Sequence, residues 1–350
     1  MQAKYDYIIA GHGLAGALLA YELEQRGQSV LVVDHYNRNS SSNVAAGIIH
    51  PITGRRLVKT WLFDTAYPLA MKTYSALESK FGVCLFTKLP IAEIFTSVKN
   101  RNDWLERSAV PGFEHIIGEE LPPDFNTGIN CIYGGIKINS SGFLQIKNLI
   151  NASSDYLHTQ NRFIRGLLNS GNIYIDENII KYNEFTASQV IFCEGYSANT
   201  NLFFQSIPFQ PSKGEIITVV CNGLNADYII NKSIFILPLG NNLYRVGSTY
   251  QWDSLNEIVT ESALEYLKSQ FESIVKLPYQ LADHSAGIRP TIKNRRPVIG
   301  MSASHPNIGI FNGLGTKGVL LAPLLASVFA DQLVYKKRIP YDLYNAADYS

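Results

Sequence analysis

Residues 5–34 read YDYIIAGHGLAGALLAYELEQRGQSVLVVD, and they hold the clearest structural pattern in the chain. An apolar run leads into three glycines, a segment with small and apolar residues at helical spacing, and a second apolar run. Unbroken apolar runs are typical of strands that are covered on both faces of a parallel sheet. Gly27 stands where the helix should stop. The stretch therefore predicts a strand–helix–strand unit of an α/β fold.

The three glycines have the spacing of a dinucleotide-binding turn. Gly11 would form the tight turn, Gly13 would let the backbone approach a pyrophosphate, and Gly16 would let the helix pack closely on the strand. Leu14 and Ala15 open the helix, whose free N–H groups and dipole favour an anion. A glycine-rich turn without a ligand is the alternative, but these glycines lie in register with a helix and two strands. We therefore predict a dinucleotide-binding loop.

Asp34 closes the second strand, 18 residues after Gly16. An acidic side chain at this place accepts a hydrogen bond from the ribose 2′-hydroxyl of a dinucleotide. It also repels a 2′-phosphate, which argues against NADP and leaves NAD or FAD. We include the neighbouring His35 among the expected cofactor contacts.

The composition is that of an ordinary soluble protein with a large core. The chain has 350 residues, of which 46% are hydrophobic and 17% charged, and this length suggests two to three domains. The formal net charge of +1 gives no reason to expect a polyanionic partner. The four cysteines lie far apart without the spacing of a metal site or a disulfide framework, so we expect no metal.

The sequence favours a cytoplasmic protein without a membrane anchor. Its first residues enter a strand directly, without the basic and apolar regions of a signal peptide. Residues 318–334 are apolar enough to resemble a membrane span, but Pro323 and Asp331 interrupt them and the run is short. We therefore expect a buried helix there.

A coarse pass along the rest of the chain indicates two kinds of sheet. Residues 61–81 have a helical pattern, and Ser141 could cap a helix that runs to about Leu157. Apolar runs typical of buried parallel strands occur in residues 171–180, 184–195 and 306–313, and residues 83–98 are strand-like. Alternation typical of antiparallel strands occurs in residues 214–221, 233–239 and 242–250. Because the two kinds interleave, we expect two domains built from non-contiguous segments.

A second glycine-rich loop lies in residues 310–323, IFNGLGTKGVLLAP. Its glycines, Gly313, Gly315 and Gly318, repeat the spacing of the first loop after an apolar run and before a helix. No strand is apparent after that helix, and half of a strand–helix–strand unit cannot hold a second dinucleotide. The helix N-terminus and Lys317 can still face an anionic group.

Six motifs together carry a family resemblance. AGHGLAG…VLVVD, VAAGII, VIFCEG, SKGEI, AGIRPTIKNRRPVIG and GLGTKGVLLAPLLA occur in the order seen in the D-amino-acid-oxidase-like flavoprotein superfamily. This superfamily includes glycine and sarcosine oxidases, and the oxidase half of the bifunctional enzyme that trims a carboxymethylaminomethyl group on tRNA wobble uridine. The resemblance runs from about Tyr5 to about Leu333. It implies one non-covalent FAD that is held at both ends by the two glycine loops.

The resemblance also implies the fold and the domain boundaries. We expect an α/β fold with a Rossmann-like FAD-binding domain around a parallel sheet, and an interleaved α+β substrate domain around a mostly antiparallel sheet. The FAD-binding domain would comprise residues 1–82, 139–204 and 284–350. The substrate domain would comprise residues 83–138 and 205–283.

The cofactor contacts that the resemblance implies fall into three groups beyond the first loop. One group lies along the FAD, one closes over its adenosine half, and one caps the pyrimidine edge of the isoalloxazine. These groups are Ala45, Ala46, Gly47 and Ile48; Cys193, Glu194 and Gly195; and Gly313, Leu314, Gly315, Thr316, Lys317 and Gly318. Ile179 is included among the cofactor contacts.

Three residues are expected to serve the reaction itself. Arg289 matches the arginine that pairs with a substrate carboxylate in amino-acid and glycine oxidases, and a planar guanidinium suits that role because it binds a carboxylate bidentately. Tyr250 would hydrogen-bond the substrate or wall the pocket, and Lys317 would stabilise negative charge on reduced flavin. The alternatives are an arginine that bridges strands, a tyrosine at a sheet edge and a solvated surface lysine.

The sequence departs from glycine oxidases at two places. Phe235 stands where they carry a pocket tyrosine, and the loop GLGTKG lacks the histidine or aromatic residue that follows its first glycine. The loop is closer to the tRNA-modifying branch, so glycine itself is a doubtful substrate. His50 follows the flavin loop, but we leave it out of the expected site because loop histidines are mostly surface or turn residues.

The function we expect is FAD-dependent oxidation of an amine or amino acid that bears a carboxylate. Hydride would pass to flavin N5, water would hydrolyse the imine, and oxygen would reoxidise the flavin to give hydrogen peroxide. Three alternatives stay open: a tRNA wobble-uridine trimming oxidase, an NAD-dependent dehydrogenase and a non-catalytic FAD-binding protein. The expected partners are a small-molecule substrate and oxygen, with tRNA not favoured.

Overall fold

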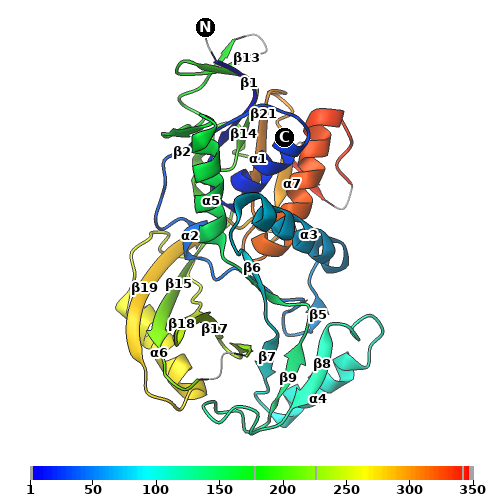
Figure 1. Ribbon diagram of the computed structural model, residues 1–350, viewed down its shortest axis with the longest axis vertical. Coiled ribbons are helices and arrows are strands. Elements are labelled where there is room, and N and C mark those ends of the chain that lie inside the picture. The colour runs from blue at the N-terminus through cyan, green and yellow to red at the C-terminus, as the bar shows by residue number, and fades with distance from the viewer. Residues whose placement is uncertain (1–2, 177–178, 225–226, 341–342, 347–350) are drawn as a thin grey trace.

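The computed structural model describes residues 3–176, 179–224, 227–340 and 343–346. Its backbone forms two large sheets, one above the other along the long axis of the molecule (Figure 1). The upper sheet carries helices α1, α3, α5 and α7, and the lower sheet carries α6 on its outer side. The confirmed fold class is thus α/β, with a parallel sheet and a mostly antiparallel sheet.

The upper sheet has nine strands and is built around the N-terminal strand β1, Ala3–Ala10. β1 pairs in parallel with β2 (Val30–Asp34) and β14 (Phe185–Phe192). Beyond these lie β11 (Phe163–Arg165), β21 (Ile308–Asn312), β20 (Val298–Met301), β22 (Tyr344–Asn345) and the hairpin of β12 (Tyr174–Asp176) and β13 (Ile179–Tyr182). The parallel strands end at one edge, which is where ligands bind in open α/β sheets.

Four helices pack beside this sheet: α1 (Leu14–Gln25), α3 (Phe63–Phe81), α5 (Ile146–Thr159) and α7 (Gly318–Tyr335). α7 lies against both α1 and α3, and the hydroxyl of Tyr74 donates to the Val319 carbonyl at 2.6 Å. Arg26, the residue directly after α1, pairs with Asp331 on α7 at 2.7 Å. In the described part of the chain, α7 has the length and composition of a membrane span, but more than half of it is buried inside the protein. It is a core helix, as its sequence predicts.

The lower sheet has eight strands. In spatial order they are β19 (Gln280–Arg289), β15 (Ser212–Val220), β18 (Leu243–Gly247), β17 (Phe235–Gly240), β16 (Ile229–Asn231), β7 (Ile91–Ile94), β9 (Gly135–Ile138) and β8 (Ile117–Leu121). Neighbours are antiparallel except for β16 and β7. α6 (Glu261–Ile274) covers one face with Leu267 and Phe271, and the other face is directed toward the upper half of the molecule.

Short elements connect the two halves. α2 is a single helical turn at Ser41–Val44, η1 is a 3-10 turn at Gly195–Thr200, and α4 runs from Val98 to Ser108 beside β8. β3 (Ile48–Ile49), β10 (Gly142–Leu144) and β6 (Phe86–Lys88) form a three-stranded sheet, and β4 (Ile52–Thr53) pairs with β5 (Val58–Lys59). These elements bring the segment after α2 to the junction between the large sheets.

Several local predictions are confirmed and others are wrong. The expected antiparallel strands within 214–250 are β15, β17 and β18, and the expected helix at 61–81 is α3. The run at 171–180 is not a buried parallel strand, since β12 and β13 form an antiparallel hairpin and β12 is exposed. A two-residue strand, β22, does follow α7, but it pairs with β20 rather than with β21.

Ser141 does not cap α5. The helix begins at Ile146, because residues 142–144 first form β10 between β3 and β6. The Ser141 hydroxyl instead donates to the carbonyls of Ile138 and Leu89. The expected domain boundary at residue 284 falls inside β19, which belongs to the lower sheet along its whole length, so we propose a boundary after Arg289.

Candidate active site

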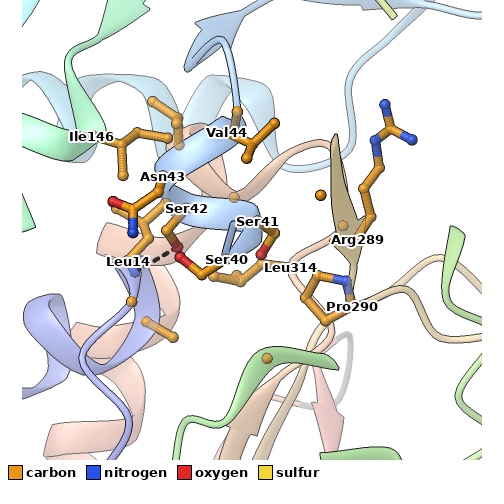
Figure 2. Close-up of a pocket in the computed structure, with 18 of the residues that line it drawn as sticks. Leu14, Ser40, Ser41, Ser42, Asn43, Val44, Ile146, Arg289, Pro290 and Leu314 are labelled. Atoms are coloured by element: carbon orange, nitrogen blue, oxygen red, sulfur yellow. Dashed lines mark hydrogen bonds between the residues drawn. The ribbon is translucent and has the colours of Figure 1, made fainter. Parts of the chain in front are cut away.

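A cavity of about 470 Å³ lies where the two sheets meet, and both sheets contribute to its wall. The upper sheet supplies the starts of α1 and α7 and the segments that follow β2 and β14. The lower sheet supplies side chains of β15, β16, β17 and β19, and α2 lies between the two contributions. Figure 2 shows α2 between the start of α1 and the strand that ends at Arg289.

The first glycine loop lies at one end of this cavity with the geometry that its sequence predicts. Gly11 has a φ of +98°, and a Cβ on it would lie 2.5 Å from the Cys193 carbonyl oxygen. A Cβ on Gly16 would lie 2.0 Å from the Gly11 carbonyl oxygen, so this glycine packs α1 onto β1 and does not line the cavity. Gly13, Leu14 and Ala15 do line it. The loop therefore presents bare backbone to a ligand.

Ser42 on α2 is a site residue that the sequence pattern did not single out. Its Oγ accepts a hydrogen bond from the Leu14 N–H at 3.1 Å, shown as a dashed line in Figure 2. It also stands 2.9 Å from where a Gly13 Cβ would lie. Ser40, Ser41 and Asn43 line the cavity beside it. Five polar residues in a row, NSSSN at residues 39–43, were the available signal for an anion-facing segment.

Asp34 lies at the end of β2, at the edge of the cavity. Its Oδ1 accepts from the His12 N–H at 2.9 Å and its Oδ2 accepts from the Tyr36 N–H at 2.8 Å. Two backbone donors thus hold the carboxylate in place, and each oxygen keeps a further lone pair for a hydroxyl group. His35 also lines the cavity.

The segment after β14 closes the same end. Cys193, Glu194 and Gly195 all line the cavity, and burial raises the pKa of the Cys193 thiol well above its ordinary value, so this thiol is inert. Burial raises the pKa of Glu194 to about 7, although Asn201 donates to its Oε2 at 2.8 Å.

Ile179 does not lie with these residues. It stands on β13, with 41% of its surface exposed, and the cavity wall does not include it. Its place is taken by Gly166, Leu167 and Leu168, which follow β11 and line the cavity. The Gly166 N–H donates to the Asp34 carbonyl at 3.0 Å, which brings this segment beside β2. The outer hairpin of β12 and β13 carries Ile179 past the edge of the site.

The segment after α2 runs along the cavity. Ala45, Ala46, Gly47 and Ile48 all line it. Gly47 has a φ of +76°, and a Cβ there would lie 2.1 Å from the Leu144 carbonyl oxygen. Small side chains and one obligatory glycine keep this backbone close to whatever occupies the cavity.

The second glycine loop lies beside the start of α1, because a Cβ on Gly318 would lie 3.3 Å from Leu14 Cδ2. Leu314, Gly315, Thr316, Lys317 and Gly318 line the cavity. Gly313 does not line it; a Cβ there would lie 2.5 Å from Ile292 Cδ1, so this glycine serves packing. Asn312 joins this loop to the segment after β14, because its side chain donates to the Gly195 carbonyl at 3.0 Å and accepts from the Gly313 N–H at 2.7 Å.

Lys317 is the cation at the start of α7. Burial lowers its pKa, and the nearby Arg296 and Arg295 lower it further. Among the described residues, no carboxylate oxygen lies within 4.0 Å of its ammonium. The start of α7 and Lys317 therefore make the part of the cavity beside them electropositive.

Arg289 ends β19 and lines the cavity. Its Nη2 donates to Ser248 Oγ at 2.7 Å, and its Nη1 donates to the carbonyls of Thr249 and Lys213 at 3.2 and 3.3 Å. Its guanidinium carbon lies 4.2 Å from the centre of the Tyr250 ring. Burial lowers its pKa. Within the described ranges, no carboxylate lies within ion-pairing distance of this guanidinium.

Gly214 makes room for the Arg289 head. A Cβ at this position would lie 2.1 Å from the Arg289 Nη2, so only glycine lets the guanidinium lie flat on β15. Arginine therefore does bridge strands, as the structural alternative supposes, but it does so through neutral oxygens only. Its positive charge is held rigidly and is not neutralised.

Tyr250 lies beside Arg289 at the rim of the cavity. Its ring stacks on Trp252 with a centroid distance of 6.2 Å, and about half of its surface is exposed. Tyr250 lines the cavity, so a hydrogen bond to the substrate and a role as pocket wall both stay predictions, and its ring also steadies the guanidinium.

This arrangement defines a class of protein: a dinucleotide-binding α/β protein with a second sheet that helps to enclose one cavity. A single FAD fits it, because glycines leave the backbone of both loops open to close approach and the starts of α1 and α7 both line the cavity. Residues 6–332 match the family described as FAD dependent oxidoreductase, and the chain belongs to that family. Its cofactor is FAD, which excludes the alternative of an NAD-dependent dehydrogenase.

Individual relatives are distant. The bifunctional protein ThiO/ThiG of Nostoc sp. is 22% identical over 96% of this chain and 53% of that protein. The tRNA 5-methylaminomethyl-2-thiouridine biosynthesis bifunctional protein MnmC of Legionella pneumophila is 24% identical over 84% of this chain and 45% of that protein. The chain thus spans about half the length of these relatives. Glycine oxidase from Bacillus cereus shares the fold, with a TM-score of 0.82 and 20% identity over 96% of each chain.

Proposed function

We propose that this flavoprotein oxidises the C–N bond of an amine or amino acid that bears a carboxylate next to the reacting carbon. The observation that carries this proposal is the state of Arg289. A partly buried guanidinium that faces a cavity and has only neutral hydrogen-bond partners is suited to receive an anionic ligand.

The chain's own residues would position the substrate rather than perform the oxidation. When bound, FAD supplies a two-electron acceptor for hydride from the substrate C–H bond. Arg289 would hold the carboxylate through its planar fork and so fix which C–H bond faces the cofactor. The substrate nitrogen loses a proton as the C=N bond forms, and water then converts the imine into an amine and an oxo acid.

Other residues would hold the cofactor and favour its reduction. The start of α1, Asp34 and Ser42 would hold the phosphate and ribose end. Lys317 and the start of α7 would supply positive charge at the other end, which favours a cofactor that gains negative charge on reduction. We further propose oxygen as the electron acceptor, hydrogen peroxide as the by-product and a cytoplasmic location.

Anaerobic mixing with a panel of amines tests this proposal. The purified protein should carry one FAD per chain, and its visible absorption should bleach with N-alkylglycines but not with the matching N-alkylamines that lack a carboxylate. A spectrum that no carboxylate-bearing amine bleaches would contradict the proposal. The relation to the tRNA-modifying protein supports one alternative substrate, an N-linked carboxymethyl group on RNA, and bleaching by such an RNA alone would favour it.

A further inference from the structure

We propose that Glu93, held by Asn231 and His50, forms a second charged end of the substrate cavity and binds a cationic group of the substrate. The inference rests on the proposed function and specifies its substrate class. The substrate would be an N-substituted amino acid with its carboxylate at Arg289 and a second, distal ammonium group at Glu93.

The register of the lower sheet places these residues in one row. Ile216 on β15 pairs with Gly247 on β18, which pairs with Phe235 on β17. Phe235 pairs with Asn231 on β16, and Asn231 pairs with Glu93 on β7. Directly paired residues point to the same face of a sheet. Because Ile216, Phe235 and Asn231 line the cavity, Glu93 lies on the cavity face as well.

Glu93 makes contacts that fix its carboxylate without neutralising it. Its Oε2 accepts from the Asn231 side-chain amide at 2.6 Å and lies 3.4 Å from His50 Nε2. The Ile52 N–H donates to His50 Nδ1 at 3.1 Å, so Nδ1 is an acceptor and Nε2 is the ring nitrogen that carries a proton toward Glu93. No lysine or arginine nitrogen in the described part of the chain lies within 4.0 Å of the carboxylate.

The side chain of Glu93 is only 15% exposed, yet its charge is not paired. Removing a carboxylate from water without a cationic partner is unfavourable, so such a group is rarely kept in a wall unless a ligand completes it. The cavity wall does not include Glu93 itself, but both side chains that hold it, Asn231 and His50, line the cavity. A ligand ammonium that passes between these two side chains would meet the Glu93 carboxylate directly behind them.

The surface between the two charged ends is apolar. Ile91, Ile229 and Phe235 line the cavity on the same face of the sheet. Phe235 lies between Gly247 and Asn231 in the row, where a methylene chain could lie across its ring. The wall therefore presents a cation, an apolar middle and then Asn231 and His50, with the Glu93 carboxylate behind these two side chains.

The separation of the ends sets the length of the substrate. Arg289 bonds Ser248, next to Gly247, and three strand steps separate Gly247 from Glu93. At about 4.8 Å per step this is about 14 Å between the two backbones. After about 3 Å is allowed at each end for hydrogen bonds, about 8–9 Å remains. N-(4-aminobutyl)glycine spans a similar length, since seven bonds at about 1.2 Å each reach about 8 Å. Glycine is too short to reach both ends.

Binding of redox-inert compounds to the FAD-loaded protein tests the inference without relying on activity. The probes are (4-aminobutylthio)acetate and (pentylthio)acetate, which have equal length and differ only in an ammonium or a methyl group at the far end. Calorimetry should show the ammonium compound binding about tenfold to a hundredfold more tightly to the wild type. Glu93→Gln, which keeps the shape of the side chain, should bring the two compounds to within about twofold.

Glu119→Gln is the matched control, because Glu119 belongs to β8 of the same sheet and pairs with Lys137 on the protein surface. It should preserve the full preference for the ammonium compound. A wild type that binds both compounds equally, or a preference that survives Glu93→Gln, would overturn the inference. The wild-type comparison stands even if the variant fails to fold.

Flavin reduction separates this inference from the proposed function. If N-(4-aminobutyl)glycine and N-pentylglycine both bleach the flavin with equal apparent affinity, the proposed function stands and the role of Glu93 is wrong. If neither amine bleaches the flavin while the inert ammonium compound still binds through Glu93, the cation-binding end stands and the oxidase proposal is wrong.

Discussion

Arg289 depends on a single glycine for its position. Gly214 lets the guanidinium lie on β15, and the oxygens of Ser248, Thr249 and Lys213 take up its hydrogen bonds. The sequence predicted which arginine faces the cavity, because Arg289 stands in a recognisable motif. It did not predict the glycine, since the contact joins positions 75 residues apart and becomes visible only in the strand register.

Glu194 makes the protein's stability depend on pH. Burial raises its pKa from 4.5 to about 7 in the folded chain. Its contribution to stability is therefore complete below about pH 4.5 and is lost as the pH rises through about 7. The free energy of unfolding falls by about 3 kcal/mol at most through this change.

Urea unfolding of the FAD-free protein at pH 5 and pH 8 measures this effect. Glu194→Gln should be less sensitive to the change in pH than the wild type, since the glutamine carries no titratable proton. Equal pH dependence in the two proteins would show that other groups account for the loss.

At the scale of elements, periodicity succeeded where an element is long or unbroken. β1, α1, β2 and α3 follow the expected bounds because their apolar pattern alone decides which face is buried. Prediction failed where tertiary pairing decides: β10 displaces the start of α5, and the apolar run at 171–180 becomes an outer hairpin. α2 was also missed, because a single turn carries too few residues to show a period.

α7 carries the electrostatic part of the site through Lys317. The positive charge of Lys317 would stabilise the anionic, reduced form of the flavin if the ammonium faces the reducible end of the cofactor. Lys317→Met removes that charge and should therefore lower the flavin reduction potential. Spectroelectrochemical titration measures this. Gly315→Ala would disturb the same loop without removing a charge, so a matching shift in that variant would assign the effect to loop geometry instead.

At the scale of the whole molecule, the active site belongs to neither sheet alone. The nucleotide end of the site could be predicted from local sequence, because its main contacts come directly after strands of the upper sheet. The proposed substrate end combines residues from β7, β16, β19 and the segment after α2, which are far apart in the chain. No local pattern relates Glu93 to Asn231 or His50, so that part of the site required the structure.

The central claim is that Arg289 binds a substrate carboxylate, and anaerobic rapid mixing tests it most directly. An N-alkylglycine and its uncharged amide analogue are each mixed with the wild type, Arg289→Lys and Arg289→Leu. Flavin bleaching then gives an apparent affinity for each combination of compound and protein. Loss of a charge-assisted pair with a buried partner costs about 2–5 kcal/mol, or about thirtyfold to several thousandfold. We predict a loss of this size for the acid in Arg289→Leu, a smaller loss in Arg289→Lys, little change for the amide and unchanged FAD content. Equal losses for the acid and the amide would contradict the claim and make Arg289 a purely structural residue.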